Sequence, residues 1–180
     1  MSGPRVLLLP GWQDSGAGHW QSLWQELYGY ERVQQHDWWR PLRGDWVARL
    51  EDVLLQSPPG ASVVLAAHSL GCQLVAAWAA HSRHAARVRG ALLVAPGDTE
   101  CAQLREVLPS WAPPVLRQLP FRSTVFGSQD DPCCTLARAR HLADAWGSTF
   151  VDYGARGHIN AASGLGDWPE GHAALMSLCQ

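Results

Sequence analysis

The segment that most constrains this chain is residues 62–79, where a buried strand is followed directly by a helix. After its first residue, the run Ser62–Ala67 is apolar and rich in β-branched side chains, as is typical of a central parallel strand covered on both faces. From Leu70 onward the apolar residues recur at helical spacing, which predicts an amphipathic helix. No residues remain for a loop, so Ser69 alone has to turn the chain. The apolar positions of this helix are Leu70, Leu74, Val75, Trp78 and Ala79.

So tight a turn requires a strained backbone at Ser69 and small residues two positions away, which are Ala67 and Gly71. This small-x-Ser-x-Gly pattern is typical of a nucleophile elbow. The hydroxyl group then projects above the sheet, and the helix N-terminus offers unpaired amides, among them that of Leu70, to a developing oxyanion. A serine that merely ends a strand or caps a helix also fits these five residues.

Length and charge narrow the class of protein. At 180 residues the chain is expected to form one domain, residues 1–180, with a substantial core. The net charge is -2, and the 14 basic residues, all arginines, are scattered along the chain. Nucleic acids and anionic membrane surfaces are therefore not expected as partners.

The N-terminus and the cysteines suggest the compartment. The apolar run Val6–Leu9 is too short for a signal peptide or a membrane span, so we expect a cytoplasmic protein. The five cysteines are odd in number and lack C-x-x-C spacing. We therefore expect reduced thiols, with neither a disulfide framework nor a zinc site.

The remaining chain alternates between short apolar runs and helical patterns, which predicts an α/β fold. The sheet is expected to have about six mostly parallel strands flanked by helices, and no large cap domain. Besides 62–67, the expected strands are Val6–Leu9, Glu31–Gln35, Ala91–Ala95, Thr124–Phe126 and Thr149–Asp152. The expected helices are His19–Leu27, burying Trp20, Leu23, Trp24 and Leu27, then Trp46–Leu55, capped by Asp45, and Leu136–Trp146. The proline-rich region Gly97–Pro120 either overhangs the site or is an ordinary surface connection.

An acid and a histidine follow the last two expected strands. Asp130 and Asp131 come after the fifth strand, and His158 comes after the sixth. Parallel strands bring all of these residues to one edge of the sheet, and the order Ser, Asp, His is that of an α/β-hydrolase. Alone, the two aspartates also fit a turn before Pro132. The joint pattern favours catalysis, and either aspartate fits.

A glycine-rich loop, residues 9–20, follows the first strand. It lacks the Gly-Lys-Ser/Thr ending of a phosphate-binding loop, which argues against nucleotide binding. In an α/β-hydrolase this loop supplies the second oxyanion amide, which we place at Trp12, with Gly11 permitting the approach of the backbone. His19 fits either a helix cap or a substrate contact, and His68 is expected to pack or line the site.

The chain resembles the small single-domain serine hydrolases of the retinoblastoma-binding-protein 9 and YdeN family. The resemblance covers nearly the whole length and implies Ser69, Asp131 and His158 as a catalytic triad. The family's tie to the retinoblastoma protein is not carried over, because the Leu-x-Cys-x-Glu pattern is absent. Ala67 replaces the more usual glycine of the elbow. The residues that carry the resemblance are Pro10-Gly11-Trp12, His19-Trp20, Asp37-Trp38, Pro41, Asp45-Trp46, Ala67-His68-Ser69-Leu70-Gly71, Gly127-Ser128, Asp131-Pro132, Gly157-His158-Ile159-Asn160 and Ser163-Gly164.

The expected activity is hydrolysis of small or medium carboxylic esters, with amides as a further possibility, through an acyl-enzyme and without a metal or organic cofactor. The only partner expected is the acyl substrate. A first alternative is an aminopeptidase whose substrate amine is bound by Asp14, Asp37 or Asp98. A second is a binding module that presents Trp38, Trp39 and Trp111. The expected lining of the site is Gly11, His68, Trp38 and Trp111.

Overall fold

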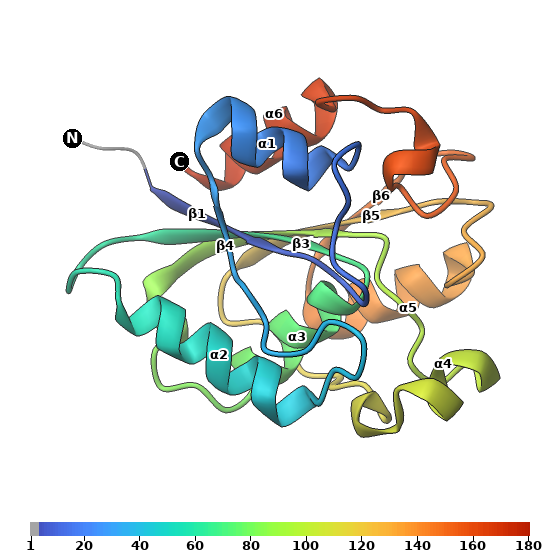
Figure 1. Ribbon diagram of the computed structural model, residues 1–180, viewed down its shortest axis with the longest axis horizontal. Helices are drawn as coiled ribbons and strands as arrows, with labels where there is room; N and C mark the ends of the chain where they lie inside the picture. The colour runs from blue at the N-terminus through green and yellow to red at the C-terminus, as the bar shows by residue number, and fades with distance from the viewer. Residues whose placement is uncertain (1–3) are drawn as a thin grey trace.

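The computed structural model describes residues 4–180, so Met1–Gly3, the start of the N-terminal segment discussed above, lie outside it. All six strands join one parallel sheet in the order β2-β1-β3-β4-β5-β6 (Figure 1). This confirms the predicted fold class. The edge strand β2 is shorter than predicted. The strands are β1 (Arg5–Leu9), β2 (Glu31–Arg32), β3 (Val63–His68), β4 (Val88–Val94), β5 (Arg122–Gly127) and β6 (Thr149–Asp152).

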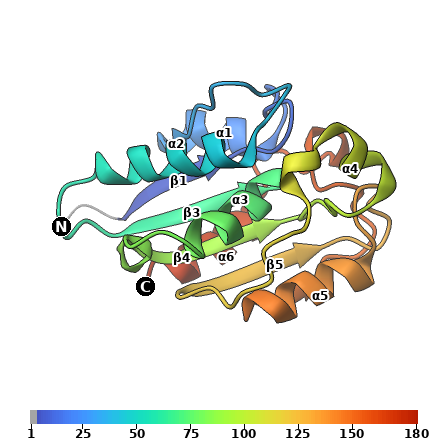
Figure 2. The ribbon, with the colours of Figure 1, turned by 90° about the horizontal axis from the view of Figure 1, so that it is seen from below.

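Helices cover both faces of the sheet. Figures 1 and 2 show α1 and α6 on one face, and α2, α3 and α5 on the other. None of the helices in residues 4–180 is long and apolar enough to cross a bilayer. The α-helices are α1 (Trp20–Tyr28), α2 (Arg43–Leu55), α3 (Leu70–Ala79), α4 (Ala102–Val107), α5 (Leu136–Trp146) and α6 (Pro169–Leu178). Short 3-10 helices are η1 (Ala85–Arg87), η2 (Pro109–Trp111) and η3 (Ala161–Ser163).

Helix α1 is rotated relative to the prediction. Leu27 is exposed, whereas Gln21 and Ser22 are buried. The polar residues are buried because they have partners: the Gln21 amide donates to the carbonyl of Ala66, and the Ser22 hydroxyl donates to that of Ser15. A pattern of apolar residues cannot reveal such partners.

Two other helices also differ from the prediction. Helix α2 begins at Arg43, so Asp45 lies in its first turn and Leu42 is the cap residue. Helix α3 is buried on all sides from Leu70 to Trp78 and is therefore not amphipathic. Packing between the sheet and α2, together with a hydrogen bond from Gln73 to the Gly97 carbonyl, explains this burial.

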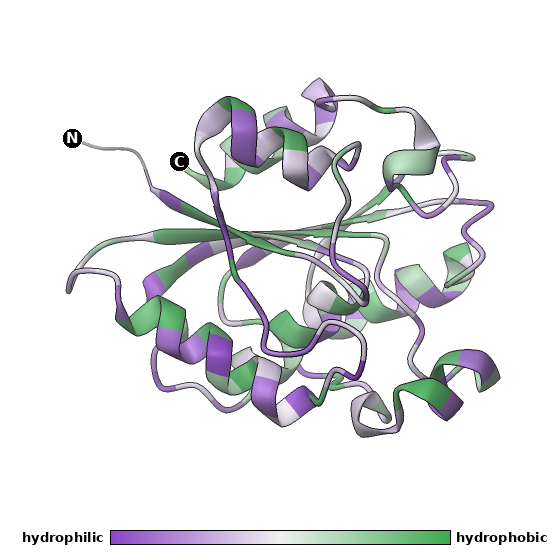
Figure 3. Cartoon of the chain, viewed as in Figure 1, coloured by the Kyte–Doolittle hydropathy of each residue, from purple (hydrophilic) through white to green (hydrophobic). Residues whose placement is uncertain are grey.

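Tryptophans fill the layers between the sheet and its helices, and apolar residues dominate the central strands (Figure 3). Seven indole rings are fully buried, and each indole N–H donates a hydrogen bond. A buried tryptophan therefore adds apolar area here without leaving its polar atom unpaired. These residues are Trp20, Trp24, Trp46, Trp78, Trp111, Trp146 and Trp168.

All five cysteines lie within residues 4–180 and are free thiols.

A methyl group at Gly71 would conflict with the backbone of β1, because a Cβ there would lie 2.2 Å from the Leu9 carbonyl oxygen. We expect Gly71→Ala to lower the free energy of unfolding by about 3 kcal/mol, measured by urea denaturation. Gly44→Ala is the matched control, because nothing lies within 4 Å of a Cβ at Gly44 in α2. That substitution should leave stability unchanged or raise it by up to about 1 kcal/mol. Equal stability of the two variants would contradict the role given to Gly71.

Candidate active site

Ser69 makes the turn between β3 and α3 in a strained conformation. Its φ of 55° and ψ of -118° lie outside the regions that residues with a side chain favour. The turn is held on both sides: the Ser69 N–H donates to the Val94 carbonyl, and the Ser69 carbonyl accepts from the Cys72 N–H. The tight reversal predicted at Ser69 is therefore present.

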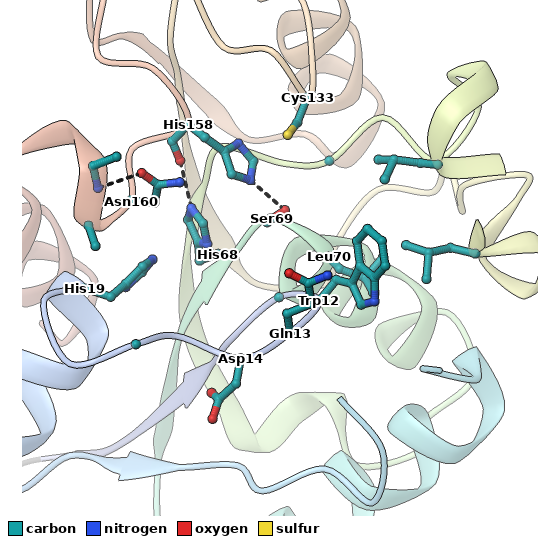
Figure 4. Close-up of a pocket in the computed structure, with 17 residues that line it drawn as sticks. Trp12, Gln13, Asp14, His19, His68, Ser69, Leu70, Cys133, His158 and Asn160 are labelled. Atoms are coloured by element: carbon teal, nitrogen blue, oxygen red, sulfur yellow. Dashed lines mark hydrogen bonds between the residues drawn. The ribbon is translucent and has the colours of Figure 1, made fainter. Parts of the chain in front are cut away.

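Ser69, His158 and Asp131 form a hydrogen-bonded chain at the carboxyl edge of the sheet. Figure 4 shows the bond between Ser69 and His158. Ser69 Oγ lies 2.9 Å from His158 Nε2, and His158 Nδ1 lies 2.9 and 3.0 Å from the two carboxylate oxygens of Asp131. The Asp131 side chain is only 2% exposed. In the neutral ring Nδ1–H donates to the carboxylate, which leaves Nε2 to accept the serine proton.

The structure distinguishes the two adjacent aspartates that the sequence pattern could not. Asp130 Oδ1 accepts hydrogen bonds from the Ser128 hydroxyl and the Gly157 N–H, so it ties together the loops after β5 and β6. Asp131 instead faces His158. Both carboxylates thus contribute to placing the histidine, but only Asp131 contacts its ring.

The His158 ring carries an unusual pKa. Burial by itself lowers the pKa of His158. Hydrogen bonds and charge interactions with the side chains of Asp131 and Cys133 outweigh this effect and raise the pKa to about 9. The protonated ring is therefore favoured when it sits beside the buried carboxylate, and the neutral ring that can accept the Ser69 proton becomes the main form above about pH 9.

Two further histidines lie behind His158 and remain neutral. The Nε2–H of His68 donates to the backbone carbonyl of His158 at 2.8 Å, and Nδ1 of His19 accepts the Gln21 N–H at 3.1 Å. The rings of His19 and His68 meet edge to face, 4.6 Å apart. Burial lowers the pKa of His19 to about 3 and that of His68 well below its ordinary value. His19 is thus the cap of α1 and also reaches the cavity described below.

The glycine-rich loop after β1 lies against the elbow. A Cβ on Gly11 would lie 2.9 Å from Ser69 Cβ and 3.2 Å from the Leu70 nitrogen, so only glycine permits this approach. The indole N–H of Trp12 donates to the Trp39 carbonyl and fixes the loop. The backbone of Trp12 is thereby held near the start of α3, whose first N–H groups lack partners within the helix.

A cavity of about 490 Å³ opens above Ser69. Gly11 and His68, both expected to line the site, do so. The cavity is polar on one side and apolar on the other, with Asn160 and Trp12 on opposite sides of Ser69 in Figure 4. Other residues around it are Gln13, Asp14, Gly16, His19, Leu70, Gly97, Leu104, Leu108, Cys133, Ala161 and Ala162.

Part of the segment Gly97–Pro120 forms one wall of this cavity, through Leu104 of α4 and Leu108 after it. The spacing of these two leucines fits one face of a short helix, but nothing in the sequence says which surface that face covers.

Trp38 and Trp111 do not line this cavity, contrary to the expectation from the sequence. Trp111 is fully buried, and its indole N–H donates to the Pro41 carbonyl. Both rings pack edge to face on Trp46, each with centroids 5.4 Å apart. These contacts bury large aromatic surfaces in the core beside α2, which accounts for the positions of Trp38 and Trp111.

Comparisons with known proteins agree with the fold and identify a family. The chain matches the family described as serine hydrolase over residues 6–177. A protein from Pectobacterium atrosepticum described as a YdeN-like hydrolase is 28% identical, with a TM-score of 0.84 over 98% of this chain and 91% of that one. The ydeN gene product of B. subtilis is 18% identical, with a TM-score of 0.78 over 97% and 98%. An esterase from Rhodococcus sp. is 16% identical, with a TM-score of 0.69 over 98% and 91%. A search among curated proteins found no match.

The chain is therefore an α/β hydrolase, and it belongs to the serine hydrolase family. At 28% identity the chain is similar to a hydrolase described as YdeN-like. The Rhodococcus and B. subtilis likenesses, at their lower identity, support the fold alone.

The difference between the two aspartates can be tested on the His158 ring itself. We expect the ring to titrate near pH 9 in the unmodified protein, followed by NMR of the imidazole signals. Asp131→Asn removes the carboxylate and should lower the pKa of His158 by about 1 unit or more. The matched control Asp130→Asn should leave it near 9. Equal shifts in both variants would show that the two carboxylates act on His158 alike.

Proposed function

We propose that this protein hydrolyses small or medium carboxylic esters through an acyl-enzyme on Ser69. The observation that carries the proposal is the hydrogen-bonded chain from Ser69 through His158 to Asp131, placed on the floor of a cavity and at the start of a helix. The same groups, in the same roles, perform acyl transfer on several unrelated folds.

In the first step His158 Nε2 takes the proton of the Ser69 hydroxyl while the oxygen attacks the ester carbonyl carbon. Asp131 orients the ring and stabilises its protonated form. The negative charge moves to the carbonyl oxygen, which accepts hydrogen bonds from the N–H groups of Leu70 and Trp12. The protonated ring then gives its proton to the leaving alkoxide as the carbon–oxygen bond breaks.

Water completes the cycle by the same route. His158 removes a proton from water, the hydroxide oxygen attacks the acyl carbon, and the proton returns to Ser69 as the acid is released. These steps need only groups of the chain and water.

The size and the lining of the cavity favour substrates with a small or medium apolar acyl group. Leu104, Leu108 and Trp12 provide an apolar wall, and a volume of about 490 Å³ is at the small end for a ligand site. Longer acyl chains would extend into solvent, because no large cap in residues 4–180 covers the opening.

An aminopeptidase is the second candidate, since Asp14 lines the cavity and offers a carboxylate to a substrate amine. However, Asp14 already forms an ion pair with Arg32 at 2.7 Å. Asp37 accepts the N–H groups of Trp39 and Arg40, and Asp98 pairs with Arg138. Because each of these carboxylates already has partners, ester hydrolysis is favoured over aminopeptidase activity.

A binding module presenting Trp38, Trp39 and Trp111 has less support. Trp39 is 69% exposed, but Trp111 is fully buried and Trp38 packs against the core. One exposed indole ring does not make an extended apolar patch.

Replacing the nucleophile tests the mechanism directly. We expect the unmodified protein to react covalently with a fluorophosphonate probe, with mass spectrometry placing the adduct on Ser69. Ser69→Ala should lose the adduct and at least about 1000-fold of kcat. Ser177→Ala, at an exposed serine of α6, is a control for serine labelling in general. A probe adduct that persists in Ser69→Ala would rule out Ser69 as the nucleophile.

A substrate panel separates esterase from peptidase. We expect p-nitrophenyl esters of short and medium acids to have higher kcat/KM than aminoacyl arylamides, because the acyl wall is apolar and Asp14 is paired. Activity should fall for long acyl chains, which cannot be buried in the cavity. Higher kcat/KM for the aminoacyl arylamides, lost in Asp14→Asn, would instead identify an aminopeptidase.

A further inference from the structure

Cys133 is a thiol at the candidate active site that the proposed mechanism does not use. Its backbone N–H donates to Asp131 Oδ1 at 2.8 Å, and its carbonyl accepts from the Asp98 N–H at 3.2 Å. These contacts fix the turn after β5 so that the sulfur lies beside the His158 ring and borders the cavity (Figure 4). The thiol is partly exposed, so it can be reached from the cavity.

The surroundings of Cys133 provide three different ligand atoms. One carboxylate oxygen of Asp131, Sγ of Cys133 and one ring nitrogen of His158 all lie within 4.8 Å of one another. Zinc bonds to sulfur at about 2.3 Å and to nitrogen and oxygen at about 2.0–2.2 Å, so a tetrahedral zinc separates its ligand atoms by about 3.4–3.6 Å. The Asp131 oxygen and His158 Nδ1 are closer than this, at 2.9 Å, and the Cys133 sulfur lies within 4.8 Å of both, so the side chains have to adjust around the ion.

We propose that Asp131, Cys133 and His158 form a zinc site that overlaps the candidate active site and inhibits it. Binding breaks the S–H bond of Cys133, releases its proton to water and forms a zinc–sulfur bond. It also breaks the Nδ1–H bond of the protonated His158 ring, on the side that faces Asp131, releases that proton to water and forms a zinc–nitrogen bond, while Nε2 keeps its proton. Three protein ligands leave the fourth position of the ion open for a water molecule. A His158 ring that is bound to zinc cannot accept the Ser69 proton, so hydrolysis stops.

The donor set selects the kind of metal ion. Thiolate and imidazole suit zinc, whereas magnesium and calcium prefer oxygen ligands only. The thiolate and the carboxylate together also balance the two positive charges of the ion. C-x-x-C spacing, the sequence signature of many zinc sites, would not reveal this one, because His158 comes from the loop after another strand.

Titration calorimetry with zinc chloride tests the binding. We expect one zinc ion per chain in the unmodified protein, and a Kd at least about tenfold weaker in both Cys133→Ser and Cys133→Ala. Cys179→Ser is the matched control, because Cys179 is a partly exposed free thiol at the end of α6, away from the cavity. Cobalt gives a second readout: a thiolate-to-cobalt absorption band should be present in the unmodified protein and in Cys179→Ser, and lost in both Cys133 variants.

The inhibition rests on the proposed function and is measured separately. The zinc concentration for half-inhibition of ester hydrolysis, relative to each variant's own rate in EDTA, should rise at least about tenfold in the Cys133 variants. Unchanged zinc affinity in these variants, or equal inhibition by magnesium, would overturn the proposal. If zinc binding depends on Cys133 but the protein hydrolyses no ester, the zinc site is supported and the proposed function is refuted.

Discussion

The contact between the end of β1 and the start of α3 determines the geometry of the whole site. The absence of a side chain at Gly71 lets α3 lie directly on the Leu9 carbonyl, where a Cβ would be only 2.2 Å from the oxygen. The same contact brings Gly11 against Ser69 and the Leu70 nitrogen. One packing constraint therefore positions both the serine and the two amides proposed to stabilise the oxyanion.

Backbone strain is concentrated at this edge of the sheet. Ser69 after β3, Ala95 after β4 and Ile159 after β6 have positive φ without being glycine. Such conformations cost free energy and persist only where the surroundings hold them. Here the surroundings are a parallel sheet and layers of tryptophan. Five of the seven buried indole N–H groups donate to loop carbonyls, among them that of Trp20 to Ile159. The tryptophan-rich core thus stabilises the loops as well as the sheet.

Much of this arrangement could be predicted from the sequence, because it depends on local patterns. The apolar runs gave the strands, and α5 was predicted with its observed bounds, Leu136–Trp146. The elbow at Ser69 followed from two periodicities that meet without a loop. The order of Ser69, Asp131 and His158 along the chain placed them at one edge, since parallel strands all end there.

The rest depended on contacts between distant segments. A sequence pattern cannot distinguish two adjacent aspartates. Only the hydrogen bonds from Ser128 and Gly157 show that Asp130 connects the loops after β5 and β6. Trp111 resembled an exposed loop residue because its partner, the Pro41 carbonyl, lies 70 residues away. The burial of α3 has the same cause, since the helix is covered by elements that its own sequence does not specify.

The charges of the site are also set by burial rather than by residue type. Three histidines lie together, with ring centroids of neighbouring pairs 4.6 and 4.8 Å apart, yet burial keeps His19 and His68 neutral while Asp131 favours the protonated form of His158. A charged His68 would repel the imidazolium that forms on His158 during catalysis, and would oppose proton transfer from Ser69. A neutral His68 instead donates to the His158 carbonyl and fixes its backbone. In the proposed mechanism two charges then develop at the cavity: the imidazolium of His158, which Asp131 stabilises, and the oxyanion, which the backbone amides at the start of α3 stabilise.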